Sequence, residues 1–309
     1  MDLRQTPEIK FAQAALKAYG LAHADGVVLS AIPTARSRTV LKVEMPKDAR
    51  YIIRVSDSAA NHLLENEIHI TAQLARTNLK SAAPIPYAAE QMFYTESPRT
   101  AVVMRFIDGQ HPVAGKVSEA TARRLGEALA QFHTVVTGLP HGNSDHLLSR
   151  YPTDWPQHKL TTAQLAGIRQ LEEVAGLFNA AKLPSGIIHG DFHTNNILLD
   201  GDDIALLDFE HSGQGILLLD IARSALDICQ TDRVFNESLL TAYIAGYEAI
   251  RSLTAEEWKM FRSAFAYAAL VVSYWFYTHD LMVESNQFIG CGIAAVKLLN
   301  SASYQKAGD

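Results

Sequence analysis

The sequence has little cysteine, and the little it has is not arranged for a metal site. Its two cysteines, Cys229 and Cys291, are far apart in the chain, whereas the ligands of a zinc site occur in closely spaced pairs. We therefore expect two reduced, buried thiols, without a disulfide framework or a structural zinc ion. Such cysteine usage is typical of a cytoplasmic protein.

The sequence also lacks a hydrophobic run long enough to cross a membrane. Its longest stretch without a charged side chain, residues 263–279, contains Ser, Tyr, Thr and His and is shorter than the roughly 20 apolar residues that a bilayer requires. Residues 1–5 have no apolar core of the kind found in signal peptides. The sequence therefore predicts neither a transmembrane segment nor a membrane partner.

Basic blocks of the kind that bind nucleic acids are absent as well. Lys and Arg total 27 against 33 Asp and Glu, so the formal net charge is −6, which argues against a nucleic-acid partner. With 309 residues, 48% of them hydrophobic, the chain can bury a sizeable core in two lobes or in one large domain. We expect such a chain to be a monomer or a homodimer.

What the sequence does contain is a polar loop between two apolar runs, in residues 187–199. Asp-Gly-Asp-Asp at 200–203 follows as a turn signal, and an apolar return strand ends on Asp208. The pattern predicts a hairpin with Asn196 near the start of one strand and Asp208 at the end of the other. Asp191 lies on the loop just before this hairpin.

Part of this segment has the spacing of a kinase catalytic loop, in which His-x-Asp is followed by four residues and then Asn: His189, Asp191 and Asn196. Asp208-Phe209 supplies a second Asp followed by an aromatic residue. Phosphoryl transfer needs a carboxylate that takes a hydroxyl proton and oxygen ligands for a divalent cation. We expect Asp191 to be the base and His189 to support the loop. Asn196 and Asp208 are expected to bind Mg²⁺; the alternative, a plain surface hairpin, is disfavoured by the strand–loop–strand context.

These motifs resemble the signatures of the aminoglycoside phosphotransferase and choline kinase family. Residues 189–198, His-Gly-Asp-Phe-His-Thr-Asn-Asn-Ile-Leu, are similar to the family's His-Gly-Asp-Leu-His-Pro-Gly-Asn-Ile-Leu. Leu-Asp-Phe-Glu at 207–210 and Asp-Ile-Ala at 220–222 match two later motifs. The resemblance implies that Asp220 braces the catalytic loop; the alternative is a charge at a helix N-terminus favoured by the dipole. His133, in an apolar helix, is expected to be structural.

The resemblance also implies a two-lobed, protein-kinase-like α+β fold with ATP in the cleft between the lobes. We expect residues 1–106 to form a small N-lobe with an antiparallel sheet and a helix that bind the nucleotide. Residues 107–309 are expected to form a larger, mainly helical C-lobe with the catalytic hairpin and the substrate-binding helices. Apolar runs at 27–30, 39–43 and 51–55 agree with strands of the N-lobe sheet.

A cation on the third strand of this sheet is expected to bind the ATP phosphates. The pattern apolar-apolar-cation-apolar indicates Arg54, although Lys42 on the second strand also fits. Arg grips a phosphate with two donors, where Lys acts as a point charge. We expect Glu67 rather than Glu65 to pair with this cation, because its spacing from Leu74 matches the family. A solvated cation and an exposed glutamate are the alternatives.

The chain lacks the Gly-rich loop that covers the phosphates in protein kinases, since residues 31–38 contain no glycine. We expect Ser37 and nearby backbone amides to contact the phosphates instead. The strand that ends with Met104 to Phe106 corresponds to the family's hinge, which implies that its backbone binds adenine.

The substrate residues are expected among the acidic and aromatic side chains of the C-lobe. A helix over 254–279 contains an aromatic-rich segment with Tyr274 and Trp275. It is either core packing or the wall of a pocket that can hold a quaternary ammonium group by cation–π contact. Glu210 and Asp280 are candidates to meet an amine.

The sequence therefore favours an ATP- and Mg²⁺-dependent phosphotransferase that acts on the hydroxyl of a small molecule. Candidate acceptors are choline or ethanolamine, homoserine, an aminoglycoside and methylthioribose, with a slight preference for an amine-bearing alcohol. No Ala-Pro-Glu motif is present and the segment from Asp208 to Asp220 is short, which argues against a protein kinase. A non-catalytic, nucleotide-binding pseudokinase is the alternative. The missing Gly-rich loop supports that alternative, whereas the presence of Asp191, Asn196 and Asp208 opposes it.

Overall fold

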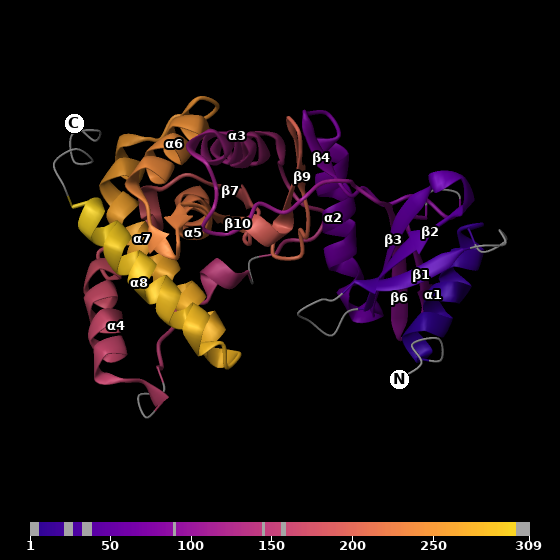
Figure 1. The fold of residues 1–309 in the computed structure, drawn as a ribbon, viewed down its shortest axis with the longest axis horizontal. Helices are drawn as coiled ribbons and strands as arrows, with labels where there is room; N and C mark the ends of the chain where they lie inside the picture. The colour runs from indigo at the N-terminus through magenta and orange to yellow at the C-terminus, as the bar shows by residue number, and fades with distance from the viewer. Residues whose placement is uncertain are drawn as a thin grey trace. The chain divides into compact units, whose positions relative to one another are not determined.

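The computed structural model describes residues 6–21, 27–32, 39–88, 91–143, 146–155 and 159–300. The chain divides into two compact units, Met1–Gly109 and Gln110–Asp309. Figure 1 shows the ribbon of both units. Unit 1 contains the strands predicted for the N-lobe, and unit 2 contains the catalytic hairpin.

Unit 1 is built on a five-stranded antiparallel sheet in the order β1-β2-β3-β6-β5. Its strands are Val28–Ile32 (β1), Thr39–Glu44 (β2), Arg50–Asp57 (β3), Phe93–Glu96 (β5) and Arg99–Arg105 (β6). The three strands predicted from apolar runs are confirmed. Val40 lies opposite Arg54 and Lys42 opposite Ile52, so both candidate cations lie on the same face of the sheet.

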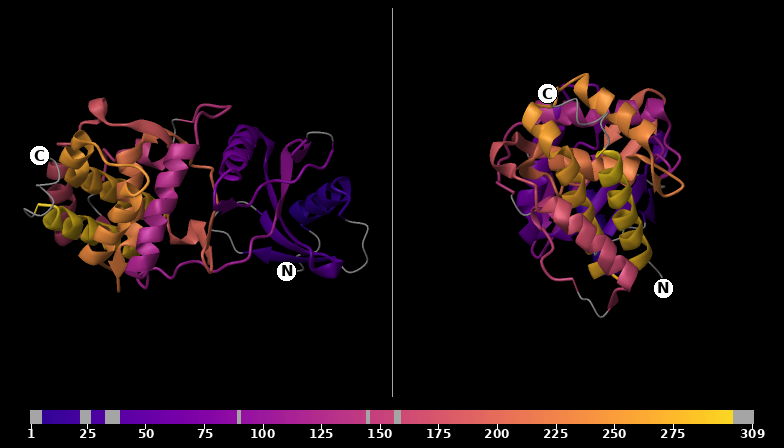
Figure 2. Two further views of the ribbon diagram at one scale, coloured as in Figure 1. Left: turned by 90° about the horizontal axis from the view of Figure 1, so that it is seen from above. Right: turned by 90° about the vertical axis from the view of Figure 1, so that its left-hand side faces the viewer.

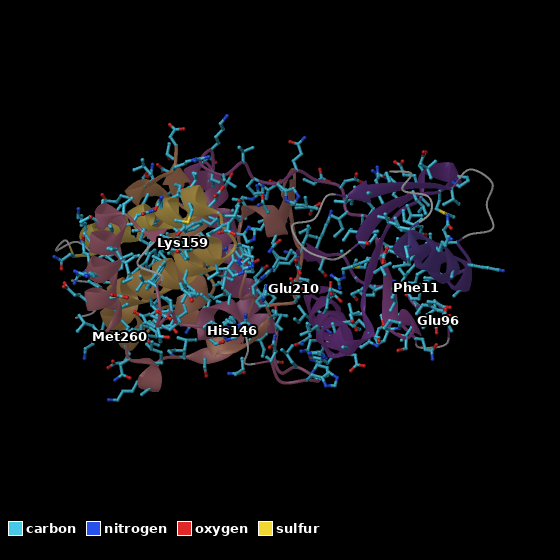
Figure 3. The ribbon with its side chains drawn as sticks, turned by 90° about the horizontal axis from the view of Figure 1, so that it is seen from below. Phe11, Glu96, His146, Lys159, Glu210 and Met260 are labelled. Atoms are coloured by element: carbon cyan, nitrogen blue, oxygen red, sulfur yellow. The ribbon has the colours of Figure 1, made fainter. Side chains whose placement is uncertain are left out.

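The two faces of this sheet bury different helices. Helix α1 (Pro7–Ala18) packs on the face that buries Leu41 and Ile53, and Phe11 belongs to the same cluster (Figure 3). On the other side, Leu64 of helix α2 (Asn61–Leu74) packs with Val102 and Met104. The remaining elements of unit 1 are short: η2 (Pro46–Asp48), η3 (Ser58–Ala60) and β4 (Leu79–Ser81).

Unit 2 is mainly helical. Its helices are α3 (Glu119–Val135), α4 (Thr162–Ala175), α5 (Leu217–Ile228), α6 (Glu237–Glu248), α7 (Ala255–Thr278) and α8 (Met282–Leu298). Helices α4, α7 and α8 pack on one another, and α3 packs on α6 (Figure 2). Helix α5 also contacts α7 and is buried along nearly its whole length, which places it at the centre of the unit.

Short strands position the loops between these helices. β7 (Ser185–Ile188) pairs with β10 (Gly213–Ile216), and β8 (Ile197–Asp200) pairs with β9 (Asp203–Leu206), both antiparallel. The β8–β9 pair confirms the predicted hairpin, whereas β10 follows no signal that we found in the sequence. Three single turns complete these connections: η4 (Leu147–Ser149), η6 (Ala180–Lys182) and η7 (Thr194–Asn196).

Local features determine two helix boundaries in unit 2. Helix α6 begins only at Glu237, because β11 (Gln230–Thr231) and β12 (Val234–Phe235) form a small hairpin before it. Asp232 and Arg233 turn this hairpin with φ of 50° and 67°. Helix α4 ends at Ala175, since Gly176 follows and glycine is a poor helix former.

The expectation that both cysteines are buried, free thiols is confirmed. Burial raises the pKa of Cys291 to about 12 and that of Cys229 well above its usual range, so both thiols stay protonated at neutral pH. In the part of the chain that the structure describes, every helix is too short or too polar to cross a membrane.

Helices α3 and α6 approach so closely that their contact requires glycine. A Cβ atom at Gly126 would lie 2.0 Å from the carbonyl oxygen of Tyr243, and one at Gly246 would lie 1.9 Å from that of Arg123. Backbone atoms cannot yield as the tip of a flexible side chain can, so any larger residue must push the helices apart.

We therefore expect Gly246→Ala to lower the free energy of unfolding by about 1–3 kcal/mol, the usual cost of overpacking. Gly290→Ala on α8 is the matched control, because a Cβ atom there meets nothing within 4 Å. The control should be neutral or more stable by up to about 1 kcal/mol, since alanine is the better helix former. Urea denaturation measures both, and equal stability of the two variants would contradict the close α3–α6 contact.

Candidate active site

The catalytic loop follows β7 and reaches β8 through η7, over residues 189–196. Gly190 has φ of +78°, and a Cβ atom there would lie 2.3 Å from the carbonyl oxygen of His211. Only glycine fits both the left-handed backbone and this close approach. The second residue of the His-Gly-Asp motif therefore allows the chain to turn so that Asp191 follows on the polar side of the loop.

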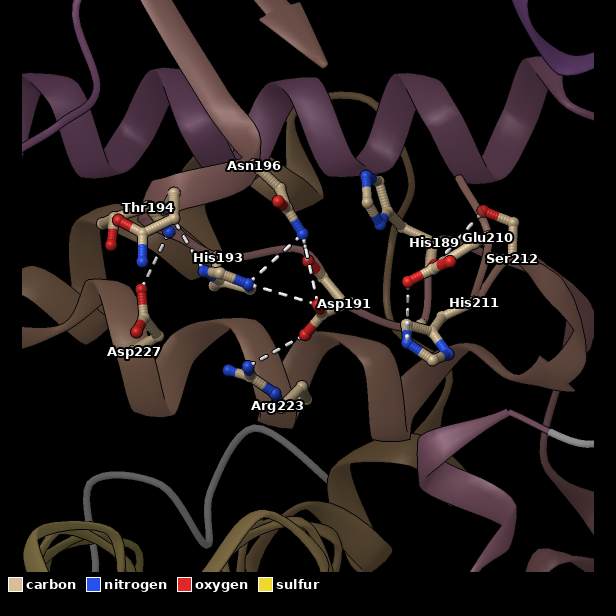
Figure 4. Close-up of polar contacts among 12 residues, drawn as sticks. His189, Asp191, His193, Thr194, Asn196, Glu210, His211, Ser212, Arg223 and Asp227 are labelled. Atoms are coloured by element: carbon tan, nitrogen blue, oxygen red, sulfur yellow. Dashed lines mark hydrogen bonds and ion pairs between the residues drawn. The ribbon is translucent and has the colours of Figure 1, made fainter. Parts of the chain in front are cut away.

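Both carboxylate oxygens of Asp191 are held by side chains of unit 2 (Figure 4). Oδ1 accepts a hydrogen bond of 3.1 Å from Nη2 of Arg223. Oδ2 lies 3.2 Å from Nε2 of His193 and 3.2 Å from Nδ2 of Asn196. The Asp191 side chain is 18% exposed. The orientation of the Asp191 carboxylate is therefore determined by three neighbours, while part of the side chain remains accessible to solvent.

The backbone determines which nitrogen of His193 carries the proton. The amide N–H of Asn195 donates to Nδ1 over 3.2 Å, so Nδ1 is an acceptor and the proton of the neutral ring is on Nε2. Nε2 is the atom that faces Asp191. His193 thus donates a hydrogen bond to the carboxylate, a contact that sequence reasoning did not assign to it.

The surroundings of Asp191 favour its ionised form. Burial by itself would raise the pKa of Asp191, but His193 and Arg223 together hold that pKa well below its usual range. At neutral pH Asp191 is therefore a carboxylate that accepts hydrogen bonds. It can orient a hydroxyl group and receive a proton that is released as the hydroxyl oxygen forms a new bond.

Asn196 and Asp208 are brought together by the β8–β9 hairpin. The N–H of Leu207 donates to the carbonyl oxygen of Asn196 over 2.9 Å, which anchors the residue before Asp208. Asp208 then takes a left-handed backbone, with φ of 60°. A non-glycine residue in this conformation costs free energy and often marks a functional site.

The donor atoms of this pair fit Mg²⁺. The side-chain nitrogen of Asn196 donates a hydrogen bond of 2.9 Å to the backbone carbonyl oxygen of Asp191. The side-chain oxygen is therefore the atom that Asn196 can offer to a cation. Mg²⁺ prefers oxygen ligands and takes few of them from the protein, with water and substrate phosphates supplying the rest. Among the described residues, no cluster of three or more His, Cys, Asp or Glu side chains could hold a metal ion.

His189 lies in an aromatic cluster rather than against the reacting groups. Its ring is completely buried, with ring centroids 5.6 Å from Phe132, 5.6 Å from Phe192 and 5.3 Å from Phe209. Burial lowers the pKa of His189, so the ring is neutral. His189, which the sequence analysis grouped with Asp191, supports the loop by packing, and Phe209 ties the Asp-Phe motif to the same cluster.

Asp220 braces the loop, as the family resemblance implied. Its carboxylate accepts the backbone N–H groups of His189 at 2.8 Å and Gly190 at 3.0 Å. Nε2 of His133 lies 3.0 Å from the same carboxylate, and Nδ1 of His133 lies 2.8 Å from the Tyr247 hydroxyl. Burial opposes ionisation of Asp220, but the hydrogen bond and charge of His133 lower its pKa below the usual value. The structural role expected for His133 is confirmed.

One face of α5 therefore holds the whole catalytic loop. Asp220 binds the start of the loop, Arg223 binds Asp191, and Asp227 accepts the N–H of Thr194 at 2.9 Å. These residues lie three and four positions apart, which places them on the same side of a helix. Sequence reasoning found Asp220 but missed Arg223 and Asp227, although their helical spacing from Asp220 was the signal that could have found them.

In unit 1, Arg54 is a buried cation with its expected partner. Arg54 and Glu67 form an ion pair in which their side chains are only 11% and 6% exposed. Lys42 instead pairs with Glu44 at 2.7 Å, is 27% exposed, and lies over the ring of Phe106. The alternatives considered for this pair are therefore wrong: Arg54 is not a solvated cation, and Glu67 is not an exposed glutamate.

Three further residues were expected to bind the nucleotide: Met104, Phe106 and Ser37. Met104 is buried on β6, and its backbone pairs with β3. The N–H of Phe106 donates to the carbonyl oxygen of Arg50 at 3.1 Å, so this amide does not remain as a donor for adenine. Ser37 lies outside the described residues.

The four expected substrate residues occupy different places in unit 2. Glu210 is buried next to His211, with 3.6 Å between its carboxylate and the imidazole (Figure 4). Tyr274 packs edge-on against Trp155 with 5.1 Å between ring centroids, and Trp275 stacks on His279 at 4.2 Å. Asp280 is exposed just beyond the end of α7. These contacts do not gather the four side chains into one cluster.

The Asp220 network predicts a pH-dependent loss of stability. Asp220→Asn should cost about 3–5 kcal/mol at pH 7, the usual effect of breaking a buried charged network. Because the folded pKa of Asp220 is lowered, its stabilisation is present above the unfolded value of 3.8 and is lost as pH falls through the folded pKa.

The difference in melting temperature between the wild type and Asp220→Asn should therefore shrink from pH 7 to pH 3.5. Asp202→Asn, on the exposed turn of the β8–β9 hairpin, is the matched control and should leave the melting temperature unchanged at both pH values. A difference for Asp220→Asn that is independent of pH would contradict this role of its charge.

Comparison with known proteins agrees with this geometry. The chain matches the phosphotransferase enzyme family over residues 28–253. It is 26% identical over 226 residues to a homoserine kinase of Neisseria meningitidis serogroup B, and the aligned region covers 70% of this chain and 72% of the relative. It is 25% identical over 222 residues to a homoserine kinase of Methylobacillus flagellatus, covering 68% and 67%.

Solved structures share the architecture along nearly the whole chain. An amicoumacin kinase, solved in complex with AMP-PNP, Ca²⁺ and Ami, has a TM-score of 0.67 at 14% identity and covers 93% of this chain and 92% of its own. A microcompartment-associated aminopropanol kinase has a TM-score of 0.66 at 19% identity, covering 97% and 98%. The expected protein-kinase-like α+β fold is thereby confirmed, and because the family match extends over most of the sequence, the chain belongs to the phosphotransferase enzyme family.

Proposed function

We propose that this protein is a kinase that transfers the γ-phosphoryl group of ATP to the hydroxyl of a small amino alcohol, with homoserine as the first candidate. The observation that carries this proposal is Asp191, an accessible carboxylate kept ionised on a loop that also contains Asn196. Homoserine comes first because the similar curated proteins in two genera are homoserine kinases. Choline, ethanolamine, aminoglycosides and methylthioribose remain in the set to be tested.

In this proposal Asp191 holds the acceptor hydroxyl. The hydroxyl oxygen forms a bond to the γ-phosphorus while the bond from that phosphorus to the β–γ bridging oxygen breaks, which releases ADP. The hydroxyl proton passes to Asp191. The carboxylate keeps one orientation during this step because it is held by His193, Arg223 and Asn196. Folding has therefore already met the free-energy cost of orienting it.

Asn196 and Asp208 would hold Mg²⁺ through their side-chain oxygens. When bound, the cation neutralises negative charge on the phosphates and on the leaving group. Arg54 would neutralise charge on the α- and β-phosphates, and Glu67 holds its guanidinium in place. Ser37 is the proposed further phosphate contact, and the backbone near Met104 is the proposed adenine contact.

The acceptor class is tested by Mg²⁺-dependent release of ADP from ATP. The panel is homoserine, 3-aminopropan-1-ol, choline, ethanolamine, methylthioribose and several aminoglycosides, with Asp191→Ala protein as the blank. We expect stimulation by an amino alcohol that is absent in the blank. Nucleotide binding without stimulation by any compound would contradict the proposed acceptor class and favour a nucleotide-binding regulator.

The role of Asp191 predicts a selective loss of turnover. Asp191→Ala should leave ATP binding intact and lower kcat by at least about 100-fold, the usual contribution of a positioned base. Asp202→Asn, which removes an exposed carboxylate from the neighbouring hairpin turn, should keep wild-type turnover. Steady-state kinetics and calorimetric ATP binding measure the two effects, and unchanged turnover in Asp191→Ala would remove this residue from the mechanism.

The role of Asp208 predicts a loss of Mg²⁺-dependent nucleotide binding. Asp208→Asn suits the test because asparagine tolerates the left-handed backbone of this position, so the charge is removed without strain. Nucleotide affinity in the presence of Mg²⁺ should fall by at least about tenfold, or about 1.4 kcal/mol. Affinity measured with EDTA should stay as in the wild type. Undiminished affinity with Mg²⁺ would show that Asp208 is no metal ligand.

A further inference from the structure

Arg223 has more hydrogen-bonding capacity than its contacts use. Its side chain is 6% exposed, and Nη2 donates to Asp191. Nε and Nη1 are buried and have no hydrogen-bond partner among the described residues. These two atoms carry three N–H groups, and each buried donor without a partner costs free energy. A buried guanidinium used in this way needs an explanation beyond the single contact with Asp191.

An ion pair with Asp191 alone would not require this arrangement. A lysine at this position would supply the same charge with three N–H donors instead of five, so fewer buried N–H groups would be without a partner. Arg223 is also held from a second side, because its guanidinium lies 5.7 Å from the centroid of the Phe288 ring. Phe288 in turn stacks on Phe276 of α7, with 5.3 Å between ring centroids. The guanidinium plane is therefore held in place by α8 and α7 while its donors remain to be satisfied.

The position of Arg223 indicates what satisfies these donors. The Asp191 carboxylate must face the acceptor hydroxyl, and Arg223 touches that carboxylate directly. A group bound by Nε or Nη1 thus belongs to a reactant that also reaches Asp191. Arg is suited to a planar oxyanion such as a carboxylate, or to a phosphate. A quaternary ammonium or a primary amine would instead be repelled by this cation.

We propose that Arg223 binds the carboxylate of the acceptor substrate, so that the acceptor is a hydroxy acid such as homoserine rather than an alcohol whose only charged group is an amine. This inference rests on the proposed kinase function and adds the residue that selects the substrate. Arg223 then has two partners, the base and the substrate, and aligns the acceptor hydroxyl with Asp191. The aromatic pair Phe276 and Phe288 supports the arginine rather than a substrate cation.

The test compares two substrates that differ only in the carboxylate. L-Homoserine and 3-aminopropan-1-ol share the hydroxyl, the amine and the carbon chain between them. In the wild type we expect kcat/KM for homoserine to exceed that for aminopropanol by at least about 100-fold. Arg223→Gln should raise the KM for homoserine about 10- to 100-fold, the range for a lost hydrogen bond to a charged group. Because Arg223 also orients Asp191, kcat should fall by a similar factor for both substrates, but only homoserine should show the higher KM, so the discrimination collapses.

Two variants control for charge and for folding. Arg223→Lys keeps the cation and should recover part of the discrimination. Arg123→Gln removes an arginine that is 51% exposed and pairs with Glu127 on the surface of α3, so it should behave as wild type. If Arg223→Gln lowers kcat equally for both substrates and leaves the KM for homoserine unchanged, Arg223 only positions Asp191 and the proposal is overturned. If the KM for ATP rises while the discrimination is kept, the oxyanion is a phosphate and the proposal also fails.

A second measurement needs no variant. L-2-Aminobutyrate, which is homoserine without its hydroxyl, should inhibit wild-type enzyme competitively with homoserine, whereas n-propylamine should not. Equal inhibition by both would exclude carboxylate recognition. Phosphorylation of aminopropanol or choline but not homoserine would leave the kinase function in place and overturn this inference alone. Absence of ADP release with every acceptor would overturn the proposed function itself.

Discussion

The buried carboxylate of Asp220 is the contact on which the candidate active site depends. It accepts two consecutive backbone amides of the catalytic loop and faces the imidazole of His133. A fully buried carboxylate is costly unless donors replace the water it has lost, and here three donors do so. Because those amides belong to His189 and Gly190, the same contact determines the direction in which the chain leaves β7 and presents Asp191.

Helix α5 is suited to this task because it is buried on nearly all sides. Its apolar residues pack against the other helices of unit 2, while Asp220, Arg223 and Asp227 form one polar stripe toward the loop. A rigid, buried element holds catalytic groups more precisely than a loop can hold itself. The aromatic cluster around His189 and Phe209 supports the loop from the opposite end by packing alone.

The protein uses buried ion pairs of two kinds. Arg54 and Glu67 lie on a strand and a helix of unit 1, where Glu67 holds the cation that we propose for the nucleotide phosphates. Arg223 and Asp191 lie in unit 2, where the pair orders the proposed base and leaves guanidinium donors for a second partner. Buried pairs contribute little net stability, so their value here is the orientation they impose on reactive groups.

Local patterns in the sequence determined the β8–β9 hairpin and the three strands of unit 1, and they singled out Asp191, Asn196 and Asp208 as candidate site residues, because spacing, turn residues and apolar runs act over a few residues. Only the tertiary structure decided that Arg223, 32 positions from Asp191, holds its carboxylate, and that Arg54 rather than Lys42 is the buried cation. These outcomes depend on which faces of distant elements pack together. Burial and pairing over such separations leave no local signal in the chain.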